Sequence, residues 1–124
     1  MKEEDKKLLL IDLCARLPFK PHVYIKDGNV DIDIDIVLNG TYIYEWLTFP
    51  SCQNITITPY LRPMSSMTEK ERNEWMEITH AQEWLIIRNL DKATDWLNKN
   101  MFDYRGLIPM GLALEAKKGM YKNE

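Results

Sequence analysis

The chain lacks several features that would place it in a functional class. Its formal net charge is −3, so it has no excess of the Lys and Arg residues that supply most non-specific affinity for nucleic acid. Its longest apolar run, LLLI, is far shorter than the roughly 20 residues that cross a bilayer. It contains no phosphate-binding glycine loop, paired-carboxylate motif or nucleophile elbow. These absences argue against membrane and nucleic-acid binding and leave no residue from which to argue catalysis.

Cysteine and histidine are scarce as well. Cys14 and Cys52 follow a charged start without signal-peptide architecture, so we expect reduced thiols and a cytoplasmic location. We interpret Cys14 as a core residue. His22 and His80 are separated by most of the chain, whereas a metal site needs three or four converging ligands. The sequence therefore predicts no metal site and no cofactor.

Length and composition indicate one globular domain over residues 1–124. The chain is 45% hydrophobic and 28% charged, which is ordinary for a folded protein. A chain of this length buries about two-thirds of its extended surface, so it needs no disulfide or metal to fold.

The first predicted element is a helix over residues 3–16. Acidic residues come first, Arg16 comes last and Pro18 follows, which is the charge order and the stop signal that helices favour. Apolar residues recur at helical spacing, so we expect a core element. These residues are Leu9, Leu10, Leu13, Cys14 and Leu17, with Leu8 and Ile11 widening the stripe.

Residues 22–58 change to an alternating pattern, with DG and NG where hairpins turn. We expect an antiparallel meander of four strands that is covered by the flanking helices or curled into a small open barrel. The strands are predicted near 22–26, 30–38, 41–48 and 54–58, and the last ends at Pro59 because proline cannot donate to a ladder.

The rest of the chain is predicted to be largely helical, which makes the fold α+β. Residues 59–67 read as an irregular connector, and Thr68 followed by Glu71 is a capping-box pattern that starts a helical region over 68–101. Residues 81–101 form either one long helix or two helices broken near 89–91, and we favour the break because Asp91 can cap the helix that follows. Residues 102–124 form a turn and a C-terminal arm, with a short strand or extended arm at LALEA.

Asp31, Asp33 and Asp35 alternate with isoleucines and therefore share one face of a strand. Three carboxylates could hold a hard cation, but a strand spreads alternate side chains almost 7 Å apart, so they do not converge. We interpret them as a solvated face that resists aggregation.

The most distinctive stretch is DWLNKNMFDYRGLIPMGLALEA, Asp95 to Ala116. Asp103 can accept bonds from the next backbone amides, Gly106 supplies free dihedrals, and Arg105 can pair with Asp103 or Asp95. Trp75, Trp84 and Met101 add to an aromatic-rich set that serves either as core or as interface anchors. The candidate interaction or structural motif comprises Trp96, Phe102, Asp103, Tyr104, Arg105 and Gly106.

The segments PYLRPMSSMTEKE, Pro59 to Glu71, and Asp95 to Ala116 resemble a group of short, uncharacterised proteins of Bacteroides and related gut bacteria, often found beside phage-like or mobile genes. The start KKLLLIDLCARLP is similar as well. Relatives often carry histidines where this chain has Asn100 and Met101, which favours a shared scaffold or docking role over shared chemistry. The resemblance implies no activity.

Three hypotheses about function follow. The first is a small non-enzymatic protein-interaction module of phage or mobile-element origin, with a foreign protein or a second copy as its partner. The second is a small-ligand binder or enzyme with a pocket between sheet and helices, and Asp103, Tyr104 and Arg105 at its rim. The third is weak nucleic-acid binding through Arg62, Lys117, Lys118 and Lys122.

Overall fold

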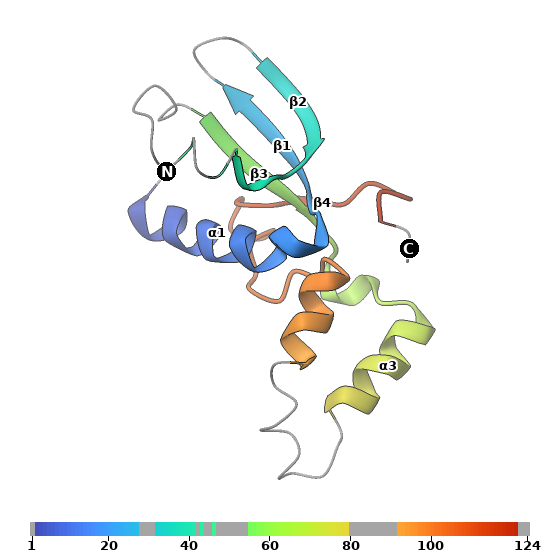
Figure 1. The fold of residues 1–124 in the computed structure, drawn as a ribbon. Helices are drawn as coiled ribbons and strands as arrows, with labels where there is room; N and C mark the ends of the chain where they lie inside the picture. Colours follow the sequence, from blue (N-terminus) through green and yellow to red (C-terminus); the bar gives the residue numbers. More distant parts are fainter. Residues whose placement is uncertain are drawn as a thin grey trace.

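In the fold, one helix lies against a four-stranded mixed sheet, and further helical segments lie beyond one end of the strands (Figure 1). The computed structural model describes residues 2–27, 32–41, 43, 46, 55–79 and 92–121. Its elements are α1 (Glu3–Arg16), η1 (Leu17–Phe19), β1 (His22–Asp27), β2 (Ile32–Val37), β3 (Ile55–Leu61), η3 (Met64–Ser66), α3 (Glu69–Thr79) and β4 (Leu114–Glu115), with further helical residues over 92–99. The predicted α+β class is confirmed.

Helix α1 has the predicted bounds, and it ends at Arg16 before Pro18. Leu9 and Leu13 are fully buried, as the apolar stripe predicted. The prediction that Cys14 lies in the core is wrong, because its thiol is exposed. The helix instead buries Asp12 and Arg16, so its covered face is partly charged.

The strand order β2-β1-β3-β4 corrects the predicted antiparallel meander. A meander would place the third strand beside the second, whereas β3 pairs antiparallel with β1 on its far side. β4 pairs parallel with β3, so the sheet is mixed, and it does not close into a barrel. The short strand at LALEA is confirmed as Leu114–Glu115.

The strand predicted over 41–48 is wrong, since the described residues 41, 43 and 46 are helical. Ile43 and Trp46 are three residues apart, and both are buried. A spacing of three residues places both side chains on the same face of a helix, and that face is buried in the core. The alternating aromatic residues of this segment also fit the two-residue period of a strand. The Trp46 indole N–H donates to the Ile55 carbonyl at 3.0 Å, which fixes this segment against β3.

Strand β3 runs through Pro59, where the sequence predicted its end. The Leu38 amide donates to the Pro21 carbonyl, so odd-numbered residues of β1 face β2 and even-numbered residues face β3. Val23 opposite Pro59 is therefore a pair without ladder bonds, and the proline nitrogen faces away from β1.

The core lies between α1 and one face of the sheet (Figure 1). The register places Val23, Ile25 and Ile57 on that face, and all three are buried. Leu107, Leu112 and Ala113 of the C-terminal segment complete the same cluster. Among the described residues, every helix is too short or too polar to cross a bilayer.

Helix α3 starts with the predicted capping box. The Glu71 amide donates to Thr68 Oγ1 at 3.2 Å, and the Thr68 amide donates to Glu71 Oε1 at 3.0 Å. The Glu71 carboxylate also accepts two bonds of 2.7 Å from the buried Arg62 guanidinium. One side chain thus starts α3 and ties it to the end of β3. Helical residues resume at 92, and the predicted break at 89–91 lies outside the described residues.

Lowering the pH should weaken the ion pair between Glu71 and Arg62. Burial alone would raise the pKa of Glu71, but hydrogen bonds from Arg62 and Thr68 and the Arg62 charge outweigh it, so the pKa lies below its usual value. Its contribution to stability is then complete above the unfolded-state pKa of about 4.3 and declines as pH falls through the lower folded pKa. We expect urea titrations at pH 3–7 to show a steeper acid loss for the natural chain than for Glu71→Gln. The exposed Glu69→Gln should keep the natural profile, and equal profiles for Glu71→Gln and the natural chain would contradict the assignment.

Candidate functional site

The stretch after residue 99 leaves the helix through a Schellman turn centred on Met101. The Phe102 amide donates to the Leu97 carbonyl at 3.0 Å, and the Met101 amide donates to the Asn98 carbonyl at 3.2 Å. Met101 has φ 61°, a conformation that favours glycine and costs a larger residue about 1–2 kcal/mol. Its side chain is buried, which offsets that strain.

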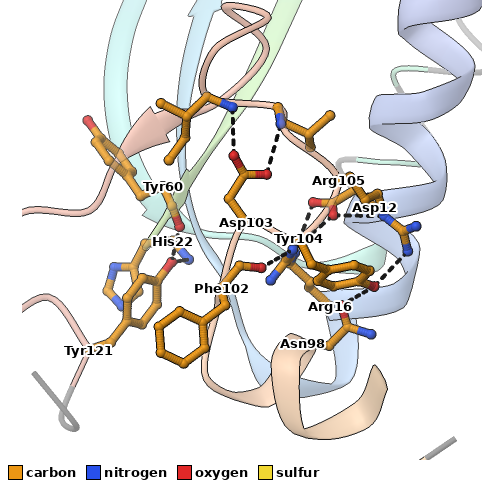
Figure 2. A network of polar contacts seen from close by, with 12 residues as sticks. Asp12, Arg16, His22, Tyr60, Asn98, Phe102, Asp103, Tyr104, Arg105 and Tyr121 are labelled. Carbon is orange, nitrogen blue, oxygen red and sulfur yellow. Dashed lines mark hydrogen bonds and ion pairs between the residues drawn. The ribbon is translucent and has the colours of Figure 1, made fainter. Parts of the chain in front are cut away.

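Asp103 closes the following turn as the sequence predicted. Its two carboxylate oxygens accept the amides of Leu107 and Ile108 at 2.8 and 2.9 Å (Figure 2). Gly106 lies within this turn and has φ 75°, a backbone conformation that glycine adopts without strain. Both carboxylate oxygens are occupied by this turn, so Asp103 has a structural function.

A buried polar cluster joins this motif to α1 and comprises Asp12, Arg16, Asn98, Tyr104 and Arg105. Arg16 binds Asp12 through Nε and Nη2 at 2.9 and 3.0 Å. The same Nη2 donates to the Phe102 carbonyl at 2.7 Å (Figure 2). Asp12 and Arg16 are fully buried, so their charges must neutralise each other inside the fold.

Tyr104 and Arg105 form the outer part of this cluster. Arg105 donates from Nε to Asp12 Oδ1 at 3.1 Å and from Nη2 to the Tyr104 hydroxyl at 2.8 Å. The Tyr104 hydroxyl donates in turn to Asn98 Oδ1 at 2.8 Å. Arg105 therefore pairs with Asp12 on α1, which corrects the predicted partners Asp103 and Asp95. Its side chain is 22% exposed and marks the rim of the cluster.

Aromatic rings continue from the motif to α3. Phe102 is fully buried and stacks on Trp96 at 5.5 Å, and Trp96 lies 5.5 Å from Trp75. The Arg62 guanidinium covers the Phe102 ring at 4.3 Å. These contacts hold α3 and the helical residues 92–99 together, and Trp84 lies outside the described residues.

The opposite face of the sheet carries a second polar group. Asp35 of β2 accepts the Tyr60 hydroxyl at 2.7 Å and the Lys117 ammonium at 2.9 Å. These two bonds hold the pKa of the Asp35 carboxyl below its usual value. Burial and the bond to Asp35 raise the pKa of Tyr60, and Asp35 raises that of Lys117. All three pKa values move away from neutrality, so none of the groups is prepared for proton transfer at pH 7.

Tyr121 ties the C-terminal arm into this face. The register places His22 opposite Tyr60 one step beyond the paired residues of β1 and β3. There the His22 amide donates to the Tyr121 hydroxyl at 3.0 Å, and that hydroxyl donates to the Tyr60 carbonyl at 2.7 Å (Figure 2). The hydroxyl thus replaces a direct ladder bond between the strands.

Two hollows flank the Arg62–Glu71 pair. One has a volume of about 410 Å³ and the other about 230 Å³. Asp103, Tyr104 and Arg105 line neither of these two hollows. The larger hollow is lined by Arg62, Pro63, Ser66, Thr68, Glu115, Ala116 and Lys118.

The structure shows no cluster of three or more His, Cys, Asp or Glu that could hold a metal ion within the described ranges. His22 packs edge-on against the Tyr121 ring at 5.2 Å. His80, Cys52 and Asp31 lie outside those ranges.

Sequence reasoning missed the buried charges of Asp12, Arg16, Arg62 and Glu71. An Asp and an Arg four residues apart are typical of an exposed helical ion pair. The sequence did contain a signal for Asp12 and Arg16, because both lie beside Leu9 and Leu13 on the helix face that α1 buries.

Comparison with protein-family models, curated proteins and solved structures found no match. The resemblance of residues 59–71 and 95–116 to short Bacteroides proteins stays a prediction.

Removing Asp12 should strongly destabilise the fold. Asp12→Ala leaves the Arg16 charge buried without a counterion, and we expect a loss of about 3–5 kcal/mol in the free energy of unfolding. Glu4→Ala, at an exposed site on the same helix, should cost at most about 1 kcal/mol. The double variant Asp12→Leu with Arg16→Met removes both charges and should be more stable than Asp12→Ala. Urea denaturation checks all three, and a near-neutral Asp12→Ala would contradict the role of the cluster.

Proposed function

We propose that this chain is a small non-enzymatic protein-interaction module of phage or mobile-element origin. The observation that carries the proposal is the use of its buried charges. Each buried charged side chain of the described residues, namely Asp12, Arg16, Arg62, Glu71 and Asp103, is bonded to a partner within the chain. The buried polar groups therefore stabilise the fold, and we assign the recognition of a partner protein to the surface of the chain.

The pKa directions support the same proposal. General acid–base catalysis needs a group whose pKa lies near the working pH. The pKa values of Asp35 and Glu71 are lowered, and those of Tyr60 and Lys117 are raised. Each shift fixes the charge state that the group already has at pH 7 and thus favours structural over catalytic use.

Nucleic-acid binding receives less support from the four cations named for it. Arg62 is buried against Glu71, and Lys117 is bonded to Asp35. Lys118 is exposed, and Lys122 lies outside the described residues. The phage or mobile-element origin rests on the resemblance of residues 59–71 and 95–116.

The proposal is tested by immobilising the purified chain, capturing proteins from a Bacteroides lysate and repeating the binding with each purified candidate. We expect at least one partner to bind in defined stoichiometry, and no turnover in broad hydrolase and transferase screens. Asp12→Ala, which weakens the frame, is the matched control and should lose the partner as it unfolds. Turnover without any reproducible partner would overturn the proposal.

A second candidate, the binding of a small polar ligand, is favoured by the 410 Å³ hollow. This volume is within the range of small-molecule sites. Its lining places Glu115 and Lys118 near the hydroxyl-bearing Ser66 and Thr68, which suits a ligand with both an anionic and a cationic group.

This candidate is tested by screening zwitterionic metabolites for a thermal shift. For any hit, we expect Glu115→Ala and Lys118→Ala to weaken binding about tenfold each, as loss of one charge-assisted hydrogen bond does. Lys7→Ala, at an exposed position on α1, should bind as the natural chain does. A hit insensitive to both changes would exclude this hollow.

A further inference from the structure

The larger hollow opens where the pairing of β3 with β4 ends. The Ala116 amide donates to the Leu61 carbonyl at 2.8 Å, one step beyond the last paired residues, Leu61 and Glu115. In a parallel ladder the next bond would run from the amide of residue 63 to the Ala116 carbonyl. Residue 63 is proline, which has no N–H to donate. The ladder therefore stops here, and Pro63 and Ala116 both line the hollow of about 410 Å³.

Two side chains of opposite charge line the same hollow without pairing. Glu115 and Lys118 are three residues apart in the C-terminal arm, and both are exposed. Within the described residues, neither side chain forms an ion pair or a hydrogen bond. The third charged lining residue, Arg62, is neutralised by Glu71. The lining thus offers one available carboxylate and one available ammonium group, which a ligand with both charges would satisfy.

The uncharged polar groups extend both halves of this site. The Ala116 carbonyl, which lacks its ladder donor, is an acceptor next to the Glu115 carboxylate, and an ammonium group can donate to both. The Thr68 oxygen accepts the Glu71 amide, so the hydroxyl hydrogen can donate to an anionic group that Lys118 also binds. Thr68 directly precedes α3, and the N-terminal end of a helix favours negative charge.

We propose that this hollow binds a free amino acid. The ammonium group of the ligand bonds to the Glu115 carboxylate and the Ala116 carbonyl. The carboxylate of the ligand bonds to the Lys118 ammonium group and the Thr68 hydroxyl. The volume leaves room for a ligand side chain beside the two charged groups. This inference rests on the second candidate function, the binding of a small polar ligand, and it names the ligand class and the orientation of the ligand.

The first test records proton–nitrogen NMR spectra of the natural chain with each standard amino acid at millimolar concentration. At least one amino acid should shift the amides of Ser66, Thr68, Ala116 and Lys118 in a saturable way. For that amino acid, N-acetylation removes the ammonium group and amidation removes the carboxylate. Each change should weaken binding at least about tenfold, as loss of a charge-assisted hydrogen bond does. Equal binding by either modified form, or no shift of these amides by any amino acid, overturns the inference.

The N-trimethyl form of the same amino acid separates this inference from the candidate function on which it rests. It keeps both charges but has no N–H to donate to the Ala116 carbonyl, so it should bind at least about tenfold more weakly. Equal binding would leave the small-ligand candidate standing and overturn the amino-acid inference. If neither an amino acid nor any other zwitterionic metabolite binds at the hollow, both are overturned.

A variant tests the orientation of the ligand. Glu115→Gln should weaken binding of the free amino acid about tenfold and change binding of the N-acetyl form by at most about twofold, because the variant and the acetyl group remove the same contact. Glu77→Gln, at an exposed position of α3 outside the hollow, is the matched control and should bind as the natural chain does. An equal loss for the free and the N-acetyl forms would overturn the inference, because the ammonium group would then lie away from Glu115.

Discussion

The structure depends on the bond that Arg16 makes to the Phe102 carbonyl. It joins the first helix to a residue 86 positions later, in an interior where neither group meets water. A guanidinium is costly to bury, and Asp12 offsets that cost by binding two of its nitrogens. Arg16, Asp12 and the Phe102 carbonyl depend on one another. Helix α1 and the segment around Phe102 are therefore correctly joined only when all three groups are in place.

A second arginine–carboxylate pair lies on the other side of Phe102. Arg62 covers the phenyl ring, and its own backbone amide and carbonyl bond to Met101 and Asp103. Glu71 neutralises Arg62 and starts α3 at the same time. The segment around Phe102 is thus held through its carbonyl, its ring and both neighbouring peptide groups. Within the motif, Phe102, Asp103, Tyr104 and Arg105 therefore each make contacts that hold the fold together.

Local signals in the sequence predicted local structure well. The bounds of α1, the Thr68–Glu71 capping box and the Asp103 turn all depend on contacts within five residues. The position of β3 beside β1 depends on the long connection after β2, whose residues 43 and 46 fold as helix and not as strand. The roles of Asp12 and Arg16 depend on Phe102, and the pairing of Arg105 depends on Asp12. No spacing rule connects residues so far apart in the chain, so these contacts could not be predicted.

The same contacts tie most of the sheet to the buried frame. Helix α1 covers one face, and on the other face Lys117 and Tyr121 bind Asp35, Tyr60 and the end of β1. At the opposite end of the sheet, β3 is paired with β4, and Arg62 continues the pairing with residues 101–103. The contacts of Arg62 and Tyr121 belong to the buried frame and to the arm that closes on it, so a change there would first affect folding. The backbone of β2 is bonded to β1 along one side, and its Asp35 side chain is bonded to Tyr60 and Lys117. Ile34 and Val37 of β2 are exposed, so a change at either side chain leaves the two arginine pairs in place.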